Sequence, residues 1–344
     1  MGCAIQFIPL TIFNFLVLSM RILFILVLPL ILTACNSGEE NGDIVLSQPP
    51  FDRLTDSIRQ APQNAELYYR RGVLLYQNNE AAYAEKDLMK AWQLSPKEEY
   101  ALSMTTLLKQ KNADSAIVFL QQATQKLPHS IALQIGLARG YQKKGEVNKA
   151  IAITDEIIEQ YPNQVDALTL KSEILNNQND KSGSLAYLER AYSLVPSDPS
   201  LAYDLAYEYA EMKNSKALLL TDSLIKAKAP EFEKAYYIKG FYLSNIGSSG
   251  EAIKNYDEAI RTNYNFLDAY RDKGQLLLDQ KKYEAALKTF QLALKVAPAS
   301  ADFYFLEGKA LQAMGNKEEA KLNYQRAYGL DKSMTEAKDA ADKL

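Results

Sequence analysis

The chain has 344 residues, of which 47% are hydrophobic and 24% are charged, and its formal net charge is −3. This composition is typical of a globular protein with a substantial core and excludes an intrinsically disordered chain. The sequence has no block of basic residues, so we expect no binding to nucleic acid. One histidine and two cysteines are too few for a zinc site or a disulfide framework, and we expect neither a metal nor a cofactor.

The N-terminal segment, residues 1–34, is almost continuously apolar and carries a single charge, on Arg21. Residues 20–34 combine a positive start, an apolar stretch and small residues before Cys35, which are the three parts of a secretory signal peptide. Because the segment before Met20 carries no positive charge, we hypothesise that translation starts at Met20. The alternative interpretation is one or two transmembrane helices in the same region, whose length allows them.

Leu32, Thr33 and Ala34 lead into Cys35 and together resemble the bacterial lipobox, an aliphatic residue and two small residues before an obligatory cysteine. The resemblance implies that the signal peptide is removed before Cys35 and that this residue is lipidated, which would anchor the chain to a membrane. Residues 35–50 include glycines, acidic residues and a Pro-Pro pair, and they show no helical periodicity. We therefore predict a lipidated flexible tether over this range.

The residues after Cys35 bear on localisation. Asn36 does not resemble the Asp that retains some enterobacterial lipoproteins in the inner membrane, so we expect the bacterial outer membrane. Glu39, Glu40 and Asp43 resemble a surface-export signal of some Bacteroidetes lipoproteins. Both orientations, on the periplasmic face or on the cell surface, stay open.

The rest of the chain has an internal period of 34 residues. Pro128, Pro162, Pro196 and Pro230 are each separated by this step, and Pro298 lies two further steps on. Small residues recur at two fixed places between these prolines, with aromatic and aliphatic residues at helical spacing around them. The first small place holds Gly72, Gly240, Gly274 and Gly308, and the second holds Ala84, Ala116, Ala150, Ser184, Ala252, Ala286 and Ala320.

This pattern resembles the tetratricopeptide repeat (TPR), a unit of two antiparallel helices that approach closely where both side chains are small. We predict an all-α, right-handed α-solenoid with eight TPR units over residues 65–334. Residues 51–64 are predicted to be the capping helix of a partial repeat, and residues 335–344 a C-terminal capping helix. The least regular unit follows Pro199, where Ala217 falls one residue early, and we expect its first helix to be shortened.

The resemblance implies a concave face lined by the first helix of each unit, on which we predict a partner groove. Its nominated residues are Tyr69, Tyr76, Arg139, Tyr203, Tyr207, Tyr237, Phe241, Arg271 and Phe305. Rigid aromatic side chains on such a face suit the binding of an extended peptide or a helix, because they bury area at low entropy cost. The alternative is that these side chains pack against the adjacent unit.

The functional prediction is a membrane-anchored scaffold of the bacterial cell envelope that binds envelope proteins in this groove. The alternative is a surface lipoprotein that captures a glycan or nutrient through its aromatic side chains. The sequence shows no nucleophile with a base and no phosphate-binding glycine loop, so we expect that the protein is not an enzyme.

Overall fold

The computed structural model describes residues 44–344, so the predicted signal peptide, the lipidation site Cys35 and the first part of the tether lie outside the described residues. From residue 44 onward every regular element is helical, with no strand in this part of the chain. The predicted all-α class is confirmed. No helix within residues 44–344 has both the length and the apolar character needed to cross a membrane.

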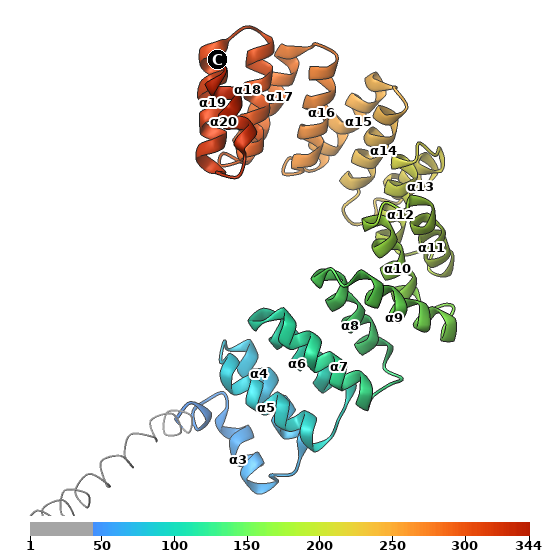
Figure 1. The fold of residues 1–344 in the computed structure, drawn as a ribbon, viewed down its shortest axis with the longest axis vertical. Helices are drawn as coiled ribbons and strands as arrows, with labels where there is room; N and C mark the ends of the chain where they lie inside the picture. Colours follow the sequence, from blue (N-terminus) through green and yellow to red (C-terminus); the bar gives the residue numbers. More distant parts are fainter. Residues whose placement is uncertain (1–43) are drawn as a thin grey trace, which may run out of the picture. The chain divides into compact units, whose positions relative to one another are not determined.

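The described residues form two compact units, which we call unit 1 and unit 2; they divide after Gly140, inside α8 (Ile131–Lys144). The described part of unit 1 begins with α3 (Asp52–Gln60). Two hairpins follow, α4 (Ala65–Gln77) with α5 (Ala81–Leu94), and α6 (Glu98–Lys111) with α7 (Ala113–Lys126). The two helices of each hairpin pack against each other, and α3 packs against α4 (Figure 1).

Unit 2 continues the same alternation of helices joined by short turns (Figure 1). It contains α9 (Val147–Gln160), α10 (Val165–Asn177), α11 (Lys181–Leu194), α12 (Pro199–Glu211), α13 (Lys216–Ala227), α14 (Glu233–Asn245), α15 (Ser249–Thr262), α16 (Leu267–Asp279), α17 (Tyr283–Val296), α18 (Ala301–Ala313), α19 (Lys317–Leu330) and α20 (Thr335–Asp342). From α10 to α19, each even-numbered helix packs against the next to form a hairpin, and each hairpin packs against its neighbour. The predicted solenoid of TPR hairpins is confirmed, and α20 packs on the last one.

The helix ends follow from local sequence. Helix α11 ends at Leu194, two residues before Pro196, and α17 ends at Val296, two residues before Pro298. A proline cannot continue the helical hydrogen-bond ladder and also disfavours helical geometry in the residue before it. At the other end, the side chain of Asp198 caps α12 by accepting a hydrogen bond from a backbone N–H of its first turn.

Small residues allow the two helices of a hairpin to approach closely, as the sequence predicts. A Cβ atom added at Gly274 would lie 2.2 Å from a ring carbon of Phe290, and one added at Gly308 would lie 2.7 Å from the ring of Tyr324. Phe290 and Tyr324 are themselves fully buried. Because each glycine has no side chain, it leaves room for an aromatic ring of the second helix.

The unit formed by α12 and α13 differs from the expectation. We predicted a shortened first helix, but α12 has 13 residues, the same length as α14 and α16. Its N-terminus is well supported, since Pro199 occupies the first turn and Asp198 caps it. The shorter helix is α13, with 12 residues; it ends at Ala227, and the next residue, Lys228, has the left-handed conformation.

The predicted tether also needs a correction at its C-terminal end. Residues 44–46 form one helical turn, where we expected no helix. The hydroxyl of Thr55 on α3 donates a hydrogen bond to the Leu46 carbonyl at 2.6 Å, and the side chain of Phe51 is buried. These contacts hold the segment against α3, so any flexible tether ends before residue 44.

Candidate functional site

Three of the nominated aromatic residues in unit 2 form a continuous row across two first helices. The ring of Tyr207 on α12 stacks on Phe241 of α14, with centroids 5.2 Å apart and an interplanar angle of 2°. Phe241 in turn stacks on Tyr237, at 6.4 Å. Tyr237 also meets the edge of Phe266, which lies just before α16. We call these four residues the aromatic row, and all of them are half-buried.

The middle of the aromatic row is fixed by a hydrogen bond to the next first helix. The hydroxyl of Tyr237 donates to Oδ2 of Asp272 on α16, at 2.8 Å. Burial raises the pKa of Tyr237 strongly, so its phenol keeps its proton. Burial also raises the pKa of Asp272, and the hydrogen bond from Tyr237 partly opposes this effect. The contact therefore positions the ring of Tyr237 against α16.

The nomination of Tyr203 as a groove residue is wrong. Its side chain is only 8% exposed, and its hydroxyl donates a hydrogen bond to the Pro230 carbonyl at 2.9 Å. Burial raises the pKa of Tyr203 to about 12. Tyr203 therefore anchors the connection between α13 and α14. This agrees with the alternative interpretation, in which the nominated side chains pack against the adjacent repeat.

Arg271 and Phe305 are half-buried and belong to local clusters on α16 and α18. Arg271 forms an ion pair with Asp268 and lies 3.7 Å from a carboxylate oxygen of Asp302. The ring of Phe305 packs 5.5 Å from that of Tyr324. Both side chains are thus engaged in contacts within the protein.

The other three nominated residues lie in unit 1, and all are half-buried. Tyr69 packs against Tyr100 with ring centroids 4.6 Å apart, and its hydroxyl lies 3.3 Å from that of Ser103 on the next first helix. Tyr76 lies in the last turn of α4, and Arg139 lies on α8. In this unit the structure places Tyr69 in a packed aromatic pair. The role of Tyr76 and Arg139 in a partner groove stays a prediction.

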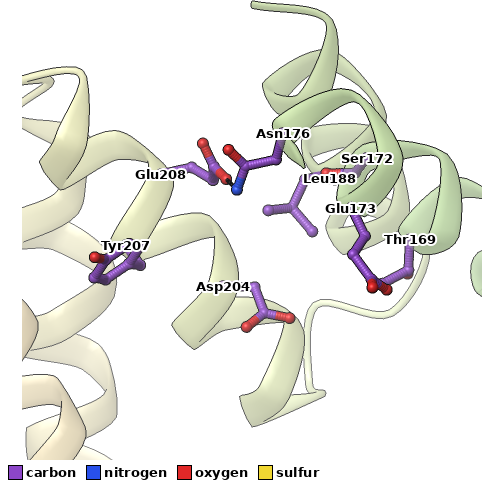
Figure 2. Close-up of a pocket in the computed structure, with 8 residues that line it drawn as sticks. All are labelled: Thr169, Ser172, Glu173, Asn176, Leu188, Asp204, Tyr207 and Glu208. Atoms are coloured by element: carbon purple, nitrogen blue, oxygen red, sulfur yellow. Dashed lines mark hydrogen bonds between the residues drawn. The ribbon is translucent and has the colours of Figure 1, made fainter. Parts of the chain in front are cut away.

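A pocket of about 320 Å³ opens between α10, α11 and α12, beside the aromatic row. We call it the acidic pocket, because three carboxylates line it: Glu173, Asp204 and Glu208. Its other lining residues are Thr169, Ser172, Asn176, Leu188 and Tyr207. Figure 2 shows Glu208 beside Asn176, with Leu188 between the two first helices. Tyr207 therefore belongs to both the pocket and the aromatic row.

Glu208 is the unusual residue of the acidic pocket. Its side chain is 5% exposed, and one carboxylate oxygen accepts a hydrogen bond from the Asn176 amide. Burial raises the pKa of Glu208, and Asp204 and Glu211 act in the same direction, whereas Lys181 and the Ser184 hydroxyl lower it. Asp204 is exposed at the pocket mouth, yet surrounding protein also raises its pKa.

Of the residues that line the acidic pocket, only Tyr207 was predicted from the sequence, although one signal for the others was available. One repeat before and after Glu208 stand Ile174 and Tyr242, and two repeats after it stands Leu276. A carboxylate at a place that other units fill with apolar residues contradicts the packing pattern. Such contradictions tend to mark functional sites.

Hairpins that repeat every 34 residues and pack closely through small side chains define a helical-repeat protein. We call the face formed by the first helices of the hairpins the first-helix face. Residues 107–174, 242–304 and 301–334 each match a family described as "Tetratricopeptide repeat". The chain is a tetratricopeptide repeat protein. It is 27% identical over 149 residues to human "Superkiller complex protein 3", a match that covers 42% of this chain and 10% of that protein. The chain thus corresponds to a small part of that relative.

Two solved structures share the fold. A tetratricopeptide repeat protein from Parabacteroides merdae has a TM-score of 0.57 at 16% identity, over 71% of this chain and 97% of that one. PilW, described as a widely conserved type IV pilus biogenesis factor, has a TM-score of 0.51 at 16% identity, over 60% of this chain and 95% of that one. The repeats support a role as a protein–protein interaction scaffold.

Proposed function

We propose that this protein is a non-enzymatic scaffold, lipid-anchored at the outer membrane of a bacterial cell envelope, that binds a segment of another envelope protein on the first-helix face of unit 2. The observation that carries the proposal is the aromatic row. Its four rings extend over the first helices α12 and α14 to the start of α16 and stay partly open to solvent. Large, rigid and partly exposed aromatic side chains are the usual anchors of a protein interface.

The geometry of the row favours a peptide or a helix over a glycan. A sugar ring needs a flat aromatic face that is open to it, but Tyr207 and Phe241 stack on each other with almost parallel planes. One face of each ring is therefore covered by the other. The partly exposed row and the adjoining acidic pocket would suit alternating apolar and polar side chains of a bound segment.

The proposed anchor rests on the sequence of the N-terminus. Leu32, Thr33, Ala34 and Cys35 match the lipobox, and the apolar segment before them matches a signal peptide. Acyl chains each contribute about 0.8 kcal/mol per buried methylene, so more than one chain on Cys35 would hold the protein stably at a membrane.

Site-specific photocrosslinking in intact cells tests the scaffold function. A photoreactive phenylalanine analogue replaces Phe241 in the row, and the matched control places it at Leu292, an exposed residue on the second helix α17. We expect a discrete crosslinked envelope protein from position 241 and none from position 292. Crosslinks from position 292 alone would place the interaction on the other face and reject the proposed groove.

A further inference from the structure

We propose that this protein forms a two-fold symmetric dimer through α13, the second helix of its least regular unit. This inference goes beyond the proposed function and does not depend on it, because the aromatic row lies on other elements. Leu219 on α13 is 73% exposed, the highest value among the large apolar side chains of residues 44–344. Three other units carry an exposed lysine at the same place of the repeat, namely Lys86, Lys254 and Lys288.

A single exposed leucine is common on protein surfaces, but this one adjoins an apolar groove. Two pockets, of about 380 and 200 Å³, open between the second helices α11 and α13, with residues of α12 between them. Both pockets are lined by Tyr192 and Leu220, so they form one groove, which we call the α13 groove. Leu219 lines the larger pocket, whereas the short side chains of Ser223 and Ala227 line the smaller one. The same helix therefore carries a protruding side chain and a hole, about two turns apart.

The positions of the protruding leucine and the hole are self-complementary. Leu219, Ser223 and Ala227 follow one another at intervals of four residues, which places them along one face of the helix. If two antiparallel copies of α13 meet about a two-fold axis near Ser223, Leu219 of each copy lies opposite Ala227 of the other. Each copy then fills the hole of its partner, so the chain supplies both halves of the contact.

The charges beside this face favour the same pairing. Asp222 and Lys226 are both exposed and lie one turn apart, with their midpoint one residue from Ser223. The same two-fold axis brings Asp222 of each copy next to Lys226 of the other, so two ion pairs form in each dimer. Asp222 forms an ion pair with Lys239 within its own chain, but its side chain is 58% exposed and can accept a second cation. This charge complementarity favours a second copy over an unrelated partner.

Disulfide crosslinking in intact cells tests the dimer. Ser223→Cys places an exposed thiol next to its counterpart at the two-fold axis. The matched control is Leu292→Cys, because residue 292 is exposed at the same place of the repeat on α17. After treatment with a membrane-permeable oxidant, we expect a dimer band from Ser223→Cys that is about tenfold stronger than the band from the control. Equal yields from the two positions, or no dimer band, overturn the proposal.

Further substitutions connect the crosslink to the proposed contact. Leu219→Glu places a charge against the apolar pocket of the partner and should lower the yield from Ser223→Cys by about tenfold, or about 1.4 kcal/mol. Because Leu219 is exposed, the thermal unfolding of the chain should not change. Asp222→Lys should lower the yield by about threefold through repulsion from Lys226, and the additional change Lys226→Asp should restore it. A yield that Leu219→Glu leaves unchanged, or a double variant without recovery, contradicts the two-fold contact.

Photocrosslinking distinguishes a second copy from another occupant of the α13 groove. A photoreactive phenylalanine analogue at Leu219 should join the chain to itself, through peptides of α13 that mass spectrometry identifies. Crosslinking to a different protein alone would reject the dimer and make the groove a docking site for that protein. Crosslinks from position 241 should persist in the Leu219→Glu variant, so the dimer and the proposed scaffold function can fail separately.

Discussion

At the scale of single residues, the close approach of Gly274 to Phe290 sets the spacing of a hairpin. We expect Gly274→Ala to lower the free energy of unfolding by about 1 to 3 kcal/mol, because the new methyl group overlaps a buried ring. The control is Gly329→Ala in α19, which has open space around it and should be neutral or stabilising by up to about 1 kcal/mol. Urea unfolding followed by circular dichroism measures both changes. Equal effects would refute the packing role of Gly274.

Glu208 makes stability depend on pH. Its pKa in the folded protein is raised above the ordinary 4.5, so the folded state binds this proton more tightly than the unfolded state does. Stability is therefore lost as the pH rises from 4.5 through the raised pKa. We expect the Glu208→Gln variant to lack this loss and to be more stable than the parent at neutral pH. Parallel unfolding curves for the two proteins across this pH range would contradict the prediction.

The sequence was sufficient for residues that obey the repeat and insufficient for those that break it. Gly274 could be placed by its spacing, because every unit repeats the same helix contact. Tyr203 could not, because its burial depends on where the connection after α13 puts the Pro230 carbonyl. The path of this connection depends on the left-handed conformation of Lys228. No short-range sequence pattern predicts that conformation.

At the scale of elements, α3 is joined to α4 by a buried polar cluster. Arg71 donates two hydrogen bonds to Asp87 on α5, at 2.6 and 2.9 Å, and a third to Thr55 on α3. The side chains of Arg71 and Asp87 are each 8% exposed. The cluster thus fixes the capping helix to the first hairpin.

We expect Arg71→Met to destabilise the protein by about 3 to 5 kcal/mol, because it leaves the Asp87 carboxylate buried without a partner. The double change Arg71→Met with Asp87→Leu removes both charges and should restore most of the loss. Urea unfolding of the two variants measures this recovery. A double variant as unstable as the single one would show that shape, not charge, holds the cluster together.

Successive hairpins are also joined by a recurring ion pair between a second helix and the next first helix. The pairs are Lys171 with Asp155, Lys239 with Asp222, and Lys273 with Asp257. The aspartates are about half-exposed, so each pair contributes little on its own, typically below about 1 kcal/mol. These pairs could not be predicted from the sequence, because helices of this kind carry too many charges for the partners to be assigned.

At the scale of the whole molecule, the proposed lipid anchor gives a direct prediction. We expect Cys35→Ser to prevent lipidation and to shift the protein out of the membrane fraction, because a serine oxygen cannot take the place of the cysteine sulfur. Fractionation of cells and labelling with a fatty-acid analogue measure both effects. Retention of Cys35→Ser in the membrane would instead favour the alternative of a transmembrane segment.

The single tryptophan of the chain, Trp92, lies on α5 in unit 1, where it is 4% exposed and meets the ring of Phe119 edge-on. Indole emission therefore reports the opening of one unit alone, while backbone dichroism reports both. If the two signals melt at different temperatures, the units unfold independently, and the native chain carries its own optical probe of cooperativity without any added label.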